Sequence, residues 1–225
     1  MKPIKTLLAD DHTIVREGLR ALLLADGGID VVAEARNGRE AVELAAALHP
    51  DVVVMDIAMP LLNGLEATRQ ILAAAPAIKV LVLSAHSDDA YIDRVIAVGA
   101  VGFLIKQTSA QILNEAIHAV MAGSMFYSPQ ISTRVRDCYQ MPDKAGGLII
   151  KKGTSLTSRE LEVIQLVAEG RANKQVAAEL KISIKTVEKH RQHLMEKLNI
   201  HDTAGLTRYA IARGIIESSV QVTIV

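Results

Sequence analysis

Short apolar runs alternate with helically periodic segments through the first 123 residues of the chain. The run from Val52 to Met55 is apolar throughout, which is typical of a strand in a sheet covered by helices on both faces. Strands that alternate with helices indicate βα units and a parallel sheet. Strands are expected at 4–9, 31–33, 51–56, 79–84 and 101–105, with helices at about 14–23, 38–48, 64–75, 88–98 and 109–122. Residues 1–123 are therefore predicted to form a doubly wound α/β domain with a five-stranded parallel sheet.

A second, different pattern occupies the C-terminal third. Periodicity weakens over residues 124–154, which are predicted to be a linker with one helix around 129–138. Beyond the linker, Thr157 and Glu160 have capping-box spacing before an apolar run, and Gly170 stands where that helix would end. Further helices are expected at 173–180, 184–198 and 202–213. Because a three-residue turn separates the middle pair, residues 155–217 are predicted to form a small all-α helix-turn-helix domain, followed by a tail at 218–225.

The charges are unevenly distributed, although 25 Lys+Arg and 25 Asp+Glu cancel over the whole chain. Residues 1–123 carry 10 basic and 15 acidic side chains, residues 124–153 carry 5 and 2, and residues 154–225 carry 10 and 8. The basic excess in the rear of the chain is compatible with a nucleic-acid partner there. A start without signal-peptide features, the lack of a long apolar run and the single cysteine, Cys138, predict a cytoplasmic protein without a membrane partner.

Polar residues stand at the carboxyl ends of four predicted strands. Asp10 and Asp11 follow the first strand, Asp56 ends the third, Ser84 ends the fourth and Lys106 follows the fifth. In an open parallel sheet these ends border the ligand crevice, so the side chains are expected to converge. Crowded carboxylates repel one another unless they share a hard cation such as Mg²⁺. Asp56 would then act as a nucleophile that forms an acyl phosphate, with Lys106 and Ser84 stabilising the transferring group.

This N-terminal region resembles the receiver domain of two-component response regulators, which is a flavodoxin-like fold. The stretches that carry the resemblance are Leu8–His12, Val54–Pro60, Asn63-Gly64, Leu83–Ala85 and Gly102–Lys106. The resemblance implies that Asp56 accepts a phosphoryl group from a sensor histidine kinase and that Lys106 contacts that group. It also implies that Asp10, Asp11, Asp56 and the backbone carbonyl of Ala58 hold Mg²⁺. The alternative for Asp11 is a role only as a helix cap.

Two further positions carry an expected switch. The resemblance implies that Ser84 and Phe103 reorient together when Asp56 is phosphorylated. Many relatives have a tyrosine at the place of Phe103, and the phenylalanine lacks its hydroxyl. A switch at Phe103 would therefore work by packing alone.

The C-terminal domain resembles the LuxR-type helix-turn-helix of the NarL/FixJ subfamily of response regulators. The matching stretches are Leu156–Glu160, Ala168–Gly170, Asn173–Ala177, Ile182–His190, Lys197-Leu198 and Arg208–Ala210. In such a domain the second helix of the motif enters the major groove. On the helix from Ile184, Val187, Leu194 and Leu198 fall on one side and are expected to pack inward.

The opposite side of that helix carries the candidate DNA contacts. Glu188, Lys189 and Gln192 are predicted to reach base edges, because their groups can pair with cytosine, guanine and adenine respectively. Phosphate contacts are predicted for the neighbouring polar residues Lys174, Lys185, Thr186, Arg191 and His193.

Together the two domains predict a transcription regulator that is switched by phosphorylation and is no enzyme beyond its own phosphoryl transfer and autodephosphorylation. The expected partners are promoter DNA with two half-sites, a cognate sensor histidine kinase and a second copy of the chain when phosphorylated or DNA-bound, with RNA polymerase as a further candidate. Two alternatives stay open: a Mg²⁺-dependent aspartate-nucleophile phosphatase or transferase, and a DNA-binding regulator that does not depend on phosphorylation.

Overall fold

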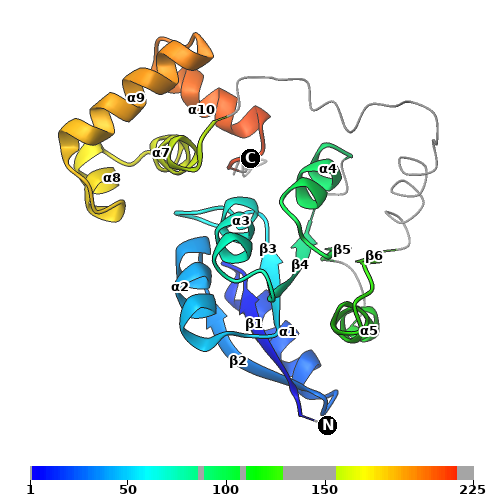
Figure 1. Ribbon diagram of the computed structural model, residues 1–225. Coiled ribbons are helices and arrows are strands. Elements are labelled where there is room, and N and C mark those ends of the chain that lie inside the picture. The colour runs from blue at the N-terminus through cyan, green and yellow to red at the C-terminus, as the bar shows by residue number, and fades with distance from the viewer. Residues whose placement is uncertain (1, 86–88, 107–109, 129–155, 217–225) are drawn as a thin grey trace, which may run out of the picture. The chain divides into compact units, whose positions relative to one another are not determined.

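The computed structural model describes residues 2–85, 89–106, 110–128 and 156–216 (Figure 1). The chain divides into two compact units, Met1–Gly147 and Leu148–Val225, and each is described by itself. No helix within the described ranges is long and apolar enough to cross a membrane. The predicted helix at 129–138, the tail at 218–225 and most of the predicted linker lie outside the described residues.

A parallel sheet of six strands forms the centre of the N-terminal unit, in the order β2-β1-β3-β4-β5-β6. The strands are β1 (Ile4–Ala9), β2 (Ile29–Ala35), β3 (Val52–Asp56), β4 (Lys79–Ser84), β5 (Gly102–Ile105) and β6 (Phe126–Tyr127). The doubly wound α/β class is confirmed, but the count of five strands is wrong by one. Strand β6 pairs with β5 inside the segment predicted to be a linker, so the sheet continues past Gly123. A strand of two residues shows no alternation from which it could be recognised.

Helices cover both faces of this sheet. They are α1 (Thr13–Leu24), α2 (Gly38–Leu48), α3 (Gly64–Ala74), α4 (Asp89–Ala97) and α5 (Ala110–Met121). Because successive strand residues point to opposite faces, the buried side chains form two cores. Phe103 belongs to the core that includes side chains of α2, α3 and α4, whereas its neighbour Leu104 belongs to the core that includes side chains of α1 and α5. Both faces are therefore buried, as the wholly apolar strands predicted.

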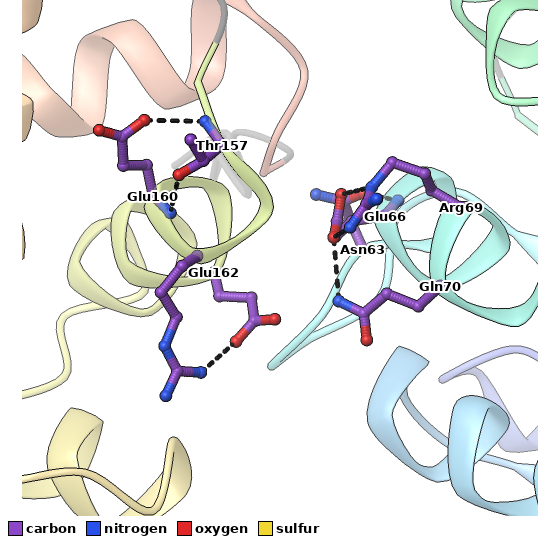
Figure 2. A network of polar contacts seen from close by, with 8 residues as sticks. Asn63, Glu66, Arg69, Gln70, Thr157, Glu160 and Glu162 are labelled. Carbon is purple, nitrogen blue, oxygen red and sulfur yellow. Dashed lines mark hydrogen bonds and ion pairs between the residues drawn. The ribbon is translucent and has the colours of Figure 1, made fainter. Parts of the chain in front are cut away.

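The start of α3 lies directly against the end of β3. A Cβ atom at Gly64 would lie within 1.8 Å of the Asp56 carbonyl oxygen, so only glycine permits this approach. Asn63 caps α3 by accepting a hydrogen bond from the backbone N–H of Glu66 at 3.0 Å. The carboxylate of Glu66 is buried and pairs with the Arg69 guanidinium at 2.7 Å (Figure 2). These contacts fix the loop that follows Asp56.

The C-terminal unit is helical, with α7 (Ser158–Ala168), α8 (Asn173–Glu179), α9 (Ile184–Leu198) and α10 (Thr203–Ala212). The predicted capping box is confirmed: Thr157 and Glu160 exchange hydrogen bonds between side chain and backbone (Figure 2). On α9, Val187 and Leu194 are fully buried, as predicted, and Leu198 is partly buried. Helices α8 and α9 with the turn between them form the predicted helix-turn-helix.

Candidate functional site

The ammonium group of Lys106 lies between two buried carboxylates at the carboxyl edge of the sheet. Its Nζ is 2.8 Å from Asp56 Oδ2 and 2.9 Å from Asp10 Oδ2. Asp10 follows β1, Asp56 ends β3 and Lys106 follows β5, so three strands supply the three groups. Strand β1 lies between β2 and β3, and the order reverses at this point, which is where open α/β sheets bind ligands. The structure therefore brings together three of the five side chains that were predicted to converge.

Asp11 completes the acidic cluster together with His12, which the sequence analysis did not propose as a ligand. One carboxylate oxygen of Asp11 lies 2.8 Å from His12 Nδ1, and ligand atoms of Asp10, Asp11, His12 and Asp56 all lie within 4.8 Å of one another. His12 is 62% exposed, and its backbone N–H donates to Asp10 Oδ1 at 2.9 Å. Asp11 precedes His12, which is the residue at the N-cap of α1, so the role of a simple helix cap for Asp11 is not the arrangement seen.

Arg16 holds the loop that contains Asp10 in place, and the sequence analysis did not identify this residue either. It is 4% exposed, and its guanidinium donates to the Asp10 carbonyl oxygen at 2.8 Å and to Glu34 Oε2 at 3.1 Å. Glu34 lies on β2 and Asp10 directly follows β1, so the two contacts tie α1 to β2 and to the loop after β1. The available signal was helical spacing: Arg16 stands seven residues before the buried Leu23 and so lies on the inward face of α1.

The electrostatics of the cluster favour a bound cation. Burial raises the pKa of Asp56 to about 6; repulsion by Asp10 and Asp11 adds to the rise, and the Lys106 ammonium opposes it. Burial alone would lower the pKa of Lys106, but attraction to Asp56 and Asp10 outweighs it, and the pKa is raised. Lys106 therefore stays charged, but its charge does not fully offset the burial of Asp56, so the ionised form of the Asp56 carboxylate remains unfavourable.

The oxygen atoms left over in the cluster suit a hard divalent cation. Three carboxylate oxygens of the cluster are buried and accept no well-directed hydrogen bond within the described residues, although Lys106 Nζ or His12 Nδ1 lies within 2.9 Å of each: they are Asp10 Oδ2, Asp56 Oδ2 and Asp11 Oδ1. Carboxylate oxygens of this kind are the ligands that Mg²⁺ prefers. Ala58 follows Asp56 by two residues in the loop before α3 and is partly exposed. The residues present thus fit the predicted Mg²⁺ site.

Ser84 and Phe103 lie on the same face of the sheet. Ser84 ends β4 and is 2% exposed, and Phe103 on β5 is fully buried. Alternate strand residues share a face, so Ser84 lies on the side of Val82, whose register partner is Phe103. The two predicted switch residues therefore lie on adjacent strands, offset by two residues in the register.

The second helix of the helix-turn-helix carries a polar, exposed face. Glu188, Lys189 and Gln192 are exposed, as base-reading residues must be. The amide of Gln192 donates to Glu196 Oε1 at 2.9 Å, so it would have to exchange that contact for a base. Among the predicted phosphate contacts, the exposed residues are Lys174, Lys185 and His193.

Two of the predicted phosphate contacts are engaged within the domain. The hydroxyl of Thr186 lies 2.8 Å from that of Ser183, and its backbone N–H donates to the same Ser183 side chain, which caps α9. The guanidinium of Arg191 donates to Asn173 Oδ1 at 2.6 Å and to Thr203 Oγ1 at 2.9 Å. Arg191 is therefore partly buried between helices, which distinguishes it from the exposed lysines.

Comparison with known proteins matches both units. The family model of the response regulator receiver domain covers residues 6–118, and that of the bacterial regulatory proteins of the luxR family covers residues 154–210. The chain is 35% identical over 225 residues to the transcriptional regulatory protein DegU of Brevibacillus brevis, covering 95% of each chain. It is 39% identical to the transcriptional regulatory protein LiaR of Bacillus subtilis, covering 92% of this chain and 96% of LiaR.

A solved structure agrees with these matches. The complex of the two-component response regulator RcsB with DNA aligns over 92% of this chain and 98% of RcsB, with 25% identity and a TM-score of 0.56. Receiver sheet, helix-turn-helix and full-length relatives therefore agree with one another. The chain belongs to the response regulators of the NarL/FixJ type, in which a receiver domain is joined to a LuxR-type DNA-binding domain that regulates transcription.

Proposed function

We propose that Asp56 is the phosphoacceptor and that a sensor histidine kinase supplies its phosphoryl group. One observation carries this assignment. Asp56 is the last residue of the central strand β3, and its carboxylate is buried and lies 2.8 Å from the Lys106 ammonium. In the transfer, an Asp56 oxygen bonds to phosphorus while the phosphorus–nitrogen bond of the phosphohistidine breaks, and the histidine nitrogen takes up a proton. Asp10, Asp11, Asp56 and the Ala58 carbonyl would hold Mg²⁺, which would neutralise charge on the transferring phosphoryl group.

The chain's own residues supply the rest of the chemistry. Lys106 stabilises negative charge as it grows on the phosphoryl oxygens, because its ammonium is already aligned and cannot be solvated freely. The Ser84 hydroxyl then donates to one of these oxygens, and Phe103 adjusts its packing on the same face. The receiver performs its own phosphorylation and dephosphorylation and no other catalysis. An acyl phosphate on Asp56 shifts the chain between two states that differ in DNA binding.

Phosphorylation at Asp56 is tested with acetyl phosphate and Mg²⁺, followed by intact-mass measurement. The wild-type chain should gain one phosphoryl group, and Asp56→Asn should gain none. Asp30→Asn is the matched control, because it makes the same chemical change at an exposed carboxylate on β2. An Asp56→Asn variant that is modified to the same extent as the wild type would show that another residue is the acceptor.

We also propose that α9 enters the major groove of promoter DNA, with Glu188, Lys189 and Gln192 at base edges. Lys174, Lys185, Thr186 and His193 hold the phosphates on either side. The RcsB–DNA complex supports the mode of binding, and a further structure described as two RcsB dimers on two parallel DNAs supports a homodimer on two half-sites. In this proposal the protein acts in the cytoplasm. A promoter-bound dimer would there contact RNA polymerase.

A further inference from the structure

Arg191 connects three helices of the DNA-binding domain through one side chain. It projects from the middle of α9, and one terminal nitrogen donates to Asn173 Oδ1 at 2.6 Å. The other terminal nitrogen donates to Thr203 Oγ1 at 2.9 Å. Asn173 is the first residue of α8 and Thr203 is the first residue of α10. The guanidinium thus holds the beginnings of two helices against the recognition helix.

The chemistry of these contacts is specific to arginine. Both acceptors are neutral oxygens on different helices, and a planar guanidinium can serve both with divergent N–H groups. A lysine ammonium on the same stem keeps the charge but lacks this fixed fork. The contacts are short and the side chain is partly buried, so residues of the domain itself hold the guanidinium in place.

Arg191 also lies beside the residues proposed to contact DNA. Gln192 follows it directly, Glu188 stands one helical turn before it, and both line the same shallow pocket as Arg191 and Asn173. Lys174, a proposed phosphate contact, follows Asn173 on α8, so the bond between Arg191 and Asn173 links the start of α8 to the helix that carries the proposed base-reading face. Base readout depends on placing those groups together to within a fraction of an ångström.

We infer that Arg191 is a positioning residue that fixes α8 and α10 against the recognition helix and thereby gives sequence preference, and that it does not hold a DNA phosphate. This inference rests on the proposed α8–α9 interface and replaces the phosphate contact expected from the sequence. Its consequence is that loss of Arg191 weakens binding to a preferred sequence much more than binding to any other sequence.

A matched control stands on the same helix. Lys197 near the end of α9 carries the same charge, and its Nζ lies 2.7 Å from Glu160 Oε2 at the start of α7. Lys197→Met removes one positive charge and one interhelical contact from α9 without touching α8. It therefore separates the effect of the Arg191 clamp from a general loss of charge or stability.

The test compares Arg191→Gln, Arg191→Lys, Lys197→Met and the wild type as full chains. The probes are a duplex enriched by the wild-type protein from a random pool and a scrambled duplex of the same length. Affinities are measured at several salt concentrations, at a temperature where circular dichroism shows every variant folded. For both Arg191 variants we expect about tenfold weaker binding to the enriched duplex, little change on the scrambled one, and an unchanged salt dependence. Lys197→Met should bind both duplexes as the wild type does.

Several results would overturn the inference. A phosphate contact predicts equal losses on both duplexes and a salt slope smaller by about 0.9. If Arg191 had only a structural role, its variants would have a lower melting temperature but would bind DNA with wild-type affinity when folded. Wild-type binding by Arg191→Lys would show that the positive charge alone suffices. Lys174→Ala and Lys189→Ala, measured alongside, test the interface: if neither weakens binding, the proposed interface fails with the inference, whereas losses in these two alone refute only the role of Arg191.

Discussion

Replacing Asp56 by asparagine should stabilise the receiver unit in the absence of divalent metal. The carboxylate is 2% exposed, and its pKa is raised from 3.8 to about 6 in the folded chain. Each unit of difference between folded and unfolded pKa corresponds to about 1.4 kcal/mol, so ionised Asp56 destabilises the fold by roughly 3 kcal/mol at pH 7.5. Asparagine has nearly the same shape as the protonated acid and carries no charge. The net shift already includes the attraction of Lys106, so the gain should be about 2–3 kcal/mol.

The pH dependence of this gain follows from the direction of the shift. Below about pH 4 both states of the wild-type chain hold the Asp56 proton, and the variant should gain nothing. As the pH rises toward 6, the unfolded state loses its proton first, so the wild-type chain loses stability relative to Asp56→Asn. Above that window the difference should be constant. Added Mg²⁺ should then stabilise the wild type more than the variant, because the cation binds the folded carboxylates.

The measurement is thermal and urea unfolding by far-ultraviolet circular dichroism in EDTA at pH 4 and pH 7.5. The two units can unfold separately, so the receiver transition is identified as the one that Mg²⁺ shifts in the wild type. Asp30→Asn, at an exposed position, should leave this transition in place. The reasoning is refuted if Asp56→Asn is no more stable than the wild type at pH 7.5, or if its gain is as large at pH 4.

Three further predictions test other parts of the molecule. Lys106→Met should slow phosphorylation by acetyl phosphate on the order of 100-fold, seen by mass spectrometry, and an unchanged rate would remove Lys106 from the chemistry. Glu160→Gln should lower the stability of the C-terminal unit by about 0.5–1 kcal/mol, because glutamine can keep the hydrogen bond to the Thr157 backbone but loses the ion pair with Lys197. Burial tends to raise the pKa of Glu160, but the Lys197 and Thr157 hydrogen bonds outweigh it, and the pKa is lowered. The loss should therefore disappear in urea unfolding at acid pH, and a loss independent of pH would contradict this. In gel-shift titrations Lys189→Ala should relax the sequence preference of DNA binding. Lys174→Ala should weaken binding to all sequences alike and reduce the salt slope by about 0.9. A uniform loss of affinity in both variants would refute the division between base-reading and phosphate-holding residues.

The acidic site could be predicted from the sequence because the carboxyl ends of parallel strands meet at one edge. The apolar strands showed where each end lies, so Asp10, Asp56 and Lys106 could be brought together without coordinates. The supporting contacts could not be found in this way. Arg16 reaches the Asp10 carbonyl through a bond between side chain and backbone that no motif encodes, and only its place on the buried face of α1 hinted at it.

In the helix-turn-helix, helical periodicity correctly separated the inward from the outward face of α9, because a period of 3.6 residues fixes which side chains share a side. It could not distinguish among the outward residues. Arg191 and Lys189 both lie off the apolar stripe, yet one bonds to Asn173 and Thr203 and the other is exposed. Whether a polar side chain near the stripe faces solvent or a neighbouring helix depends on how α8 and α10 pack, which is tertiary information.

The electrostatic state of the acidic cluster connects the proposed phosphoacceptor, Asp56, to the proposed switch. The proposed phosphorylation would replace the single charge of Asp56 by about two negative charges and three acceptor oxygens, so the site would then need more donors than Lys106 alone. Ser84 is the buried hydroxyl at the neighbouring strand end, and it shares a face with Phe103. Phe103 is fully buried in a dense core, and such packing changes between discrete arrangements and does not deform gradually. In the proposed switch, a movement of Ser84 toward the phosphoryl group would be passed on through the packing of the Phe103 ring, because phenylalanine has no hydroxyl to bond elsewhere.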